Sequence, residues 1–126
     1  MSTKTLQPRD PDSLAIDVLI ARVLAGITDI WVESDGDPKG TLPDGRRVSI
    51  CRYSSTYPGM GYLFSLLKNR RIPFVTSYEP EDERDKYHKA SLRGGSYTGE
   101  SKFAPRALAK AVVQLIRTEL EPLEVE

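Results

Sequence analysis

The segment GGSYTGES, from Gly94 to Ser101, has the residue spacing most suggestive of chemistry in this sequence. Its glycines and final serine match a phosphate-binding P-loop, in which backbone amides at a helix start cradle phosphates and a lysine neutralises their charge. Glu100 stands at the lysine position, and the polar residues before Gly94 lack the apolar pattern of the buried strand that precedes such a loop. The sequence therefore predicts a tight turn here and not an ATP-binding loop.

Arginine and tyrosine recur near this turn and at the end of a predicted strand before the middle helix. Guanidinium groups match phosphate oxygens in geometry and charge, and aromatic rings stack on bases. These residues predict a binding site for a small anionic, nucleotide-like ligand. The candidate ligand-binding residues are Arg52, Tyr53, Tyr57, Arg93 and Tyr97.

Catalytic and metal-binding side chains are scarce. His88 is the single histidine and Cys51 the single cysteine, so neither has a second residue of its kind with which to form a metal pair. The acidic run from Glu79 to Asp85 lacks the ligand spacing and the glycine of a calcium loop. We therefore expect no catalytic set, no metal site and no cofactor, and we expect a protein that is not an enzyme.

Composition excludes several other classes of protein. The 126 residues suffice for one domain, and 18 basic side chains balance 18 acidic ones, which argues against duplex nucleic acid as the main partner. No apolar run approaches the roughly 20 residues that span a bilayer. The N-terminal segment has no apolar core of a signal peptide, and one cysteine forms no internal disulfide. Both features favour a cytoplasmic location.

Hydrophobic periodicity predicts three helices and four strands. The first helix follows a cap at Asp12 or Ser13, and Gly26 ends it. Alternating or β-branched residues predict strands at 27–32, 46–53, 72–80 and 87–99, the last with a hairpin about Gly94 and Gly95, and a turn-rich loop at 34–45. The middle helix follows Ser54, and the last helix starts near Pro105.

This order, α-β-β-α-β-β-α, predicts a mixed α/β (α+β) fold in which a single antiparallel sheet of about four strands packs with three helices. Residues 1–11 are polar and contain two prolines, which predicts a flexible tail. We expect one sandwich domain over 12–120 and an acidic C-terminal tail over 121–126.

Three motifs resemble those of the small phage ABA-sandwich domain proteins. They are DVLIARVLAG at 17–26, RYSST at 52–56 and APRALAKAVVQLI at 104–116. The resemblance implies a phage or prophage origin, a location in the host bacterial cytoplasm, and an antiparallel sheet between helices. It implies no activity, because the family is defined by its architecture.

Two hypotheses of function follow. The first is a non-enzymatic phage accessory protein that sequesters a small phosphate-bearing ligand, such as a cyclic nucleotide immune signal, and so acts against host defence. The second is an inhibitor or adaptor that docks on a host or phage protein through the acidic run from Glu79 to Asp85. In both cases a symmetric homo-oligomer is expected, as is common for small soluble domains.

Overall fold

The computed structural model describes residues 9–34, 36–81, 83–84 and 87–120. These residues form three α-helices, six strands, a short 3₁₀ turn and a π-helical turn after the last α-helix. In chain order they are α1 (Pro11–Val23), β1 (Thr28–Val32), β2 (Pro38–Thr41), β3 (Arg47–Ser49), α2 (Tyr57–Asn69), β4 (Phe74–Tyr78), β5 (His88–Leu92), η1 (Arg93–Gly95), β6 (Tyr97–Ser101), α3 (Ala104–Leu115) and η2 (Ile116–Leu120). Within these residues no helix combines the length and apolar character needed to cross a bilayer.

The first helix begins earlier than its sequence predicted. Asp10, and not Asp12 or Ser13, is the N-cap residue, and its carboxylate accepts a hydrogen bond from the Ser13 amide at 3.2 Å. Pro11 therefore opens α1, because its fixed φ suits a first helical turn and it needs no hydrogen-bond acceptor there. The N-cap and the first residue of α1 thus lie within the predicted tail 1–11. Residues 1–8 and the predicted tail 121–126 lie outside the described residues.

The strands form two antiparallel sheets, with orders β1-β2-β3 and β4-β5-β6. The mixed α+β class and the three helices are confirmed, but the single sheet of about four strands is replaced by two sheets of three. The two additional strands are β2, which lies in the segment predicted as a loop, and β6, because the hairpin turn divides the predicted strand 87–99 into β5 and β6. Close packing requires glycine at position 40 of β2. A Cβ atom on Gly40 would collide with the Ile27 side chain and lie 3.1 Å from Ile30 Cγ1.

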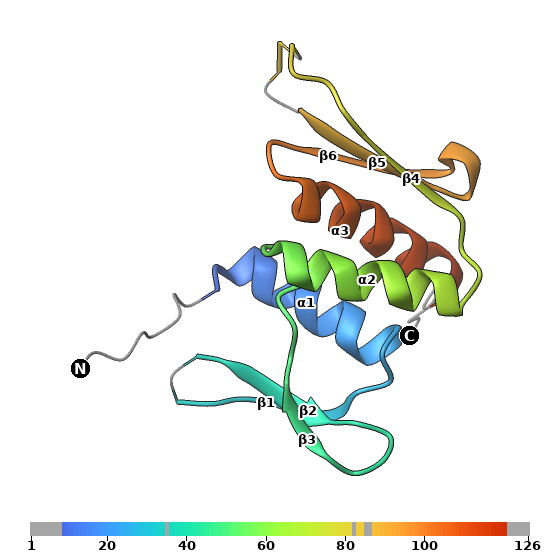
Figure 1. Ribbon diagram of the computed structural model, residues 1–126. Helices are drawn as coiled ribbons and strands as arrows, with labels where there is room; N and C mark the ends of the chain where they lie inside the picture. Colours follow the sequence, from blue (N-terminus) through green and yellow to red (C-terminus); the bar gives the residue numbers. More distant parts are fainter. Residues whose placement is uncertain (1–8, 35, 82, 85–86, 121–126) are drawn as a thin grey trace.

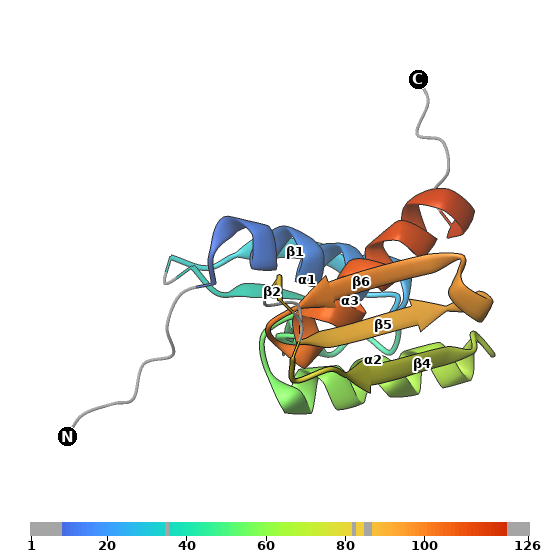
Figure 2. The same ribbon diagram turned by 90° about the horizontal axis from the view of Figure 1, so that it is seen from above.

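The helices lie between the two sheets (Figure 1), whereas the ABA-sandwich resemblance implied a sheet between helices. The sheet β4-β5-β6 lies across α3 and α2 when seen from above (Figure 2). The sheet β1-β2-β3 lies on the other side of the helices and follows α1 through a short turn. Two small sheets thus enclose one helical layer.

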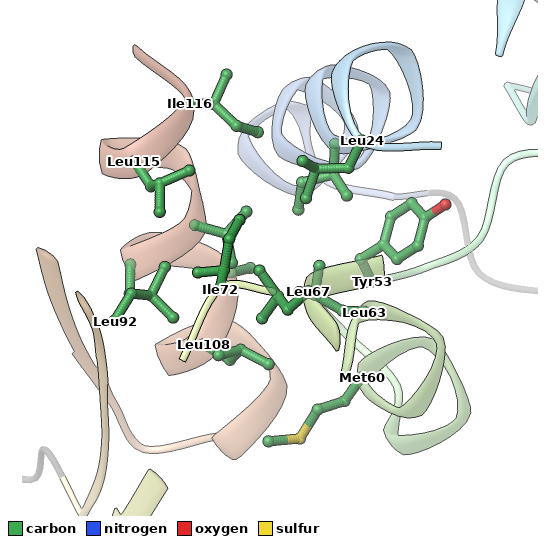
Figure 3. Close-up of a cluster of buried hydrophobic side chains, with 14 of the residues drawn as sticks. Leu24, Tyr53, Met60, Leu63, Leu67, Ile72, Leu92, Leu108, Leu115 and Ile116 are labelled. Carbon is green, nitrogen blue, oxygen red and sulfur yellow. The ribbon is translucent and has the colours of Figure 1, made fainter. Parts of the chain in front are cut away.

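The hydrophobic core gathers side chains from all three helices and from β5 (Figure 3). Leu63, Leu67, Leu92, Leu108 and Leu115 are completely buried. In the sequence the leucines of α2 and α3 recur at helical spacing, which is why the apolar stripes predicted both helices correctly. This burial of apolar surface is the main stabilising contribution to the domain.

Strand β6 lies unusually close to α3, and Gly99 makes the approach possible. A side chain on Gly99 would collide with the carbonyl oxygen of Ala107 and stand 2.9 Å from the amide nitrogen of Ala111. Because the colliding atoms belong to a helix backbone, they cannot move aside as a flexible side chain would. The third glycine of GGSYTGES is therefore explained by packing.

We predict that Gly99→Ala lowers the free energy of unfolding by about 1–3 kcal/mol, the usual cost of overpacking. Gly61→Ala is the matched control, since Gly61 is an exposed residue in α2 with no atom near its added methyl group. We expect that control to be neutral or stabilising by up to about 1 kcal/mol. Urea unfolding of the three proteins measures both changes, and equal stabilities would contradict the close packing of β6 on α3.

Candidate functional site

The segment GGSYTGES forms the tip of a hairpin and its second strand. Arg93–Gly95 make the 3₁₀ turn η1, with φ of +69° at Gly94 and +102° at Gly95, and Tyr97–Ser101 is strand β6. The next helix begins at Ala104, so the turn amides do not open a helix as those of a P-loop do. The predicted turn about Gly94 and Gly95 is confirmed.

Two of the five predicted ligand-binding residues come together beside this turn. Arg93 Nε lies 3.0 Å from Glu119 Oε1, and the Tyr97 hydroxyl donates a hydrogen bond to Glu119 Oε2 at 2.7 Å. The hydrogen bond to Glu119 raises the pKa of the Tyr97 phenol. A carboxylate of the protein therefore occupies the position in which we expected the anion.

The other three predicted residues lie in the segment that leads into α2 and at its first residue. Tyr53 is 2% exposed and packs in the core (Figure 3), and burial raises the pKa of its phenol. Tyr57 stands at the start of α2 and contacts Phe103 edge to face, with ring centroids 5.3 Å apart. Arg52 precedes α2, and its carbonyl oxygen accepts a hydrogen bond from Thr56 Oγ1. The five residues do not form one site.

Several of the other polar candidates contact a partner side chain. Glu79 in the acidic run forms an ion pair with Lys89 at 2.7 Å, and Arg84 lies 3.2 Å from Glu100. Residues 82, 85 and 86 of that region lie outside the described residues. The His88 ring packs against Tyr78 at 4.9 Å between centroids. Burial raises the pKa of the Cys51 thiol, which disfavours the reactive thiolate.

A hollow between α1 and α3, here called the cationic groove, has a volume of about 430 Å³. Arg106, Lys110 and Arg117 line it from one face of α3 and η2, whereas Asp12 is the one acidic residue among the described residues of the lining. The side chains of Ala15, Ile16, Val113 and Gln114 complete the lining. The spacing of the three cations, four and then seven residues, places them on one helix face and was visible in the sequence. The prediction of this helix rested on its apolar face, so the cationic face was missed.

Two of these cations are held in place by hydrogen bonds to neighbouring elements. Arg106 Nη1 donates to Ser13 Oγ at 2.6 Å, and its Nη2 lies 4.0 Å from Asp10 Oδ2. Lys110 Nζ donates to the Glu100 carbonyl at 3.1 Å. The positive charges are therefore positioned by α1 on one side and by β6 on the other.

A second hollow, here called the apolar groove, lies on the other side of α1 against β1 and has a volume of about 740 Å³. Its lining is mostly apolar, with Arg22 and Asp29 as its charged residues. Asp29 has a φ of +51° and lies at a β-bulge between Thr28 and Trp31. The described residues that line it are Pro11, Leu14, Ala15, Val18, Arg22, Gly26, Ile27, Thr28, Asp29, Ile30 and Val32.

These features define a small α+β protein with two three-stranded sheets around three helices and a groove on each side of α1. A solved structure of similar fold is that of a phage protein from Bacillus cereus ATCC 14579, with a TM-score of 0.58 and 16% sequence identity. The match covers 100% of this chain and 97% of that one. Comparisons with protein-family models and with curated protein sequences give no match.

We predict that Glu119→Gln lowers the pKa of Tyr97 towards that of a free tyrosine, because the negative hydrogen-bond acceptor is lost. The measurement is an absorbance titration of tyrosinate in the wild type and the variant, with Tyr97→Phe identifying the transition that belongs to this residue. Identical titration curves for the wild type and Glu119→Gln would contradict the hydrogen bond between Tyr97 and Glu119 in this cluster.

Proposed function

We propose that this protein is a non-enzymatic phage or prophage accessory protein that binds a small phosphate-bearing ligand in the cationic groove. The observation that carries the proposal is the row of three cations, Arg106, Lys110 and Arg117, along one wall of a ligand-sized hollow. They outnumber the two nearby carboxylates, Asp12 in the lining and Asp10 beside Arg106, so the groove attracts anions. The phage origin rests on the similarity of fold to the Bacillus cereus phage protein.

The dimensions and chemistry of the groove suit a ligand with an apolar part and more than one negative charge. Its volume of about 430 Å³ lies within the usual range for small-molecule sites. Arg106 and Lys110 are one helical turn apart, and Arg117 lies about two turns further along the helix. Ile16 and Val113 offer apolar surface beside these charges. A cyclic nucleotide immune signal has these properties, so the proposed role is to sequester such a signal.

Binding without catalysis is favoured by the state of the reactive side chains. Within the described residues, no group of three or more His, Cys, Asp or Glu side chains is arranged to hold a metal ion. Cys51 and His88 are not among the residues that line the cationic groove. The groove therefore offers positive charge, hydrogen-bond donors and apolar contacts, which suffice to bind an anionic ligand without catalysis.

The test is isothermal titration calorimetry with linear nucleotides, cyclic dinucleotides and cyclic ADP-ribose isomers. For any nucleotide that binds, Arg117→Glu should weaken affinity by roughly tenfold or more, because it reverses a charge in the groove. Arg46→Glu is the matched control, since Arg46 is also exposed and lies in the turn between β2 and β3. Equal effects of the two substitutions on affinity would contradict the proposal that the ligand binds in the cationic groove.

Arg93→Ala provides a further arm of the same experiment. Arg93 belongs to the site predicted from the sequence and is paired with Glu119, so we expect its loss to leave affinity unchanged. If Arg93→Ala abolishes binding and Arg117→Glu does not, the ligand binds beside the η1 turn. If no nucleotide binds the wild type, the ligand-binding proposal fails.

The second candidate is an inhibitor or adaptor that docks on a host or phage protein. The apolar groove favours it, because an exposed apolar hollow of this size suits the apolar face of a partner segment. Docking through the acidic run from Glu79 to Asp85 stays a prediction. A stoichiometric partner from host lysate that is lost with Val32→Glu and retained with Tyr62→Glu, a substitution at another exposed site, would favour this candidate.

A further inference from the structure

The two edge strands of the sheet β4-β5-β6 differ in whether side chains from the rest of the molecule bind their outward backbone groups. In an antiparallel sheet, the N–H and C=O groups of every second residue point towards one side of the strand, and those of the residues between them point towards the other side. On β6 the outward residues are Thr98 and Glu100. Gln114 of α3 accepts from the Thr98 amide at 3.2 Å and donates to the Thr98 carbonyl at 2.7 Å, while Lys110 Nζ donates to the Glu100 carbonyl at 3.1 Å. Two α3 side chains thus cap the β6 edge.

The β4 edge has no such cap among the described residues. The hydrogen bonds from Arg93 N to Pro73 O and from Glu79 N to Tyr87 O flank the β4-β5 ladder, so odd-numbered residues of β4 face β5. The backbone groups of Phe74, Thr76 and Tyr78 therefore point away from the sheet. Figure 2 shows β4 at the outer side of the sheet. Three residues of this strand thus present amides and carbonyls to the exterior.

The composition of β4 is unusual for the edge of a monomeric sheet. Such edges commonly carry a charged residue, a proline or a bulge that blocks pairing with another chain. The strand FVTSY has none of these, its register with β5 is continuous, and Val75 and Tyr78 are 65% and 61% exposed. The β4 edge therefore favours the addition of another strand.

We propose that β4 pairs antiparallel with β4 of a second copy of this chain, joining the two sheets into one of six strands. The outward residues fix the register: Thr76 faces Thr76 of the second copy, and Phe74 faces Tyr78. Three such pairs form about six backbone hydrogen bonds. Phe74 and Tyr78 make an aromatic cross-strand pair on one face, and Val75 stands opposite Ser77 on the other, so no like charges oppose each other.

The charges beside β4 fit this arrangement. Arg71 precedes the strand, and Glu79 and Glu81 follow it, all three exposed. Antiparallel pairing brings the basic end of each strand next to the acidic end of the other. This complementarity selects a second copy of the chain as the occupant of the edge. The inference is independent of the ligand proposed for the cationic groove, because it involves another surface.

Sedimentation equilibrium tests the proposal with the full chain. The wild type should be dimeric, and Thr76→Lys should raise the dimer dissociation constant by roughly tenfold or more, because two lysines then face each other. Thr98→Lys makes the same change at an exposed position on the capped β6 edge, so its dimer should match that of the wild type. Far-UV circular dichroism verifies that each variant is folded.

Mixing Thr76→Lys with Thr76→Glu provides the decisive arm. The two chains should form a heterodimer, detected by native mass spectrometry, because residue 76 of one copy faces residue 76 of the other. A monomeric wild type, a dimer that Thr76→Lys leaves intact, or the absence of a heterodimer from the mixture would each overturn the proposal. If the protein is monomeric and a strand of another protein binds along β4, the partner of the β4 edge is that other protein and not a second copy of this chain.

Discussion

The arrangement of this protein depends on one buried ion pair, between Arg9 and Asp17. Asp17 is completely buried in α1, and its carboxylate accepts hydrogen bonds from Arg9 Nη1, Ser54 N and Ser54 Oγ, each at 2.9 Å. The Arg9 guanidinium also donates to the carbonyls of Ile50 and Cys51. Burial raises the pKa of Asp17, and these donors oppose that effect. A pair of buried charges is tolerated only when such partners are present.

The pair connects three parts of the chain that are distant in sequence: the start of α1, the end of β3 and the turn before α2. Asp37, between β1 and β2, adds a carboxylate 3.4 Å from Arg9 Nη2. The pair therefore positions α1 against the sheet β1-β2-β3. Because α1 forms one wall of both grooves, and Ser13 of α1 holds Arg106, the geometry of each candidate site depends on this connection.

The sequence was most informative where a local pattern determines the structure. Apolar stripes predicted the helices, since residues such as Leu63 and Leu67 must lie on one helix face. The hairpin at Gly94 and Gly95 was predictable because both glycines adopt positive φ. Strand β2 was missed, since Gly40 serves close packing and the composition of the strand resembles a loop. The local sequence pattern does not distinguish a glycine that permits a turn with positive φ from a glycine that permits close packing.

Long-range pairing limited the prediction of the site. Arg93 and Tyr97 were identified as candidates, but their partner Glu119 lies more than twenty residues along the chain, and no local spacing reveals it. Arg9 was assigned to a tail because its neighbours are polar, although its own side chain is 2% exposed. Tyr53 was placed in the site, whereas the fold uses it in the core. Each error concerns a polar or amphipathic residue whose environment is set by tertiary structure.

The central claim, that the Arg9 and Asp17 pair holds α1 in place, is tested most directly by a double-mutant cycle with Arg9→Met and Asp17→Asn. The measurement is the free energy of unfolding in urea for the wild type, both single variants and the double variant. Each single variant should lose about 3–5 kcal/mol, because it leaves a buried charge or its donors unpaired, and the double variant should lose much less than the sum. Small and additive losses would contradict the claim.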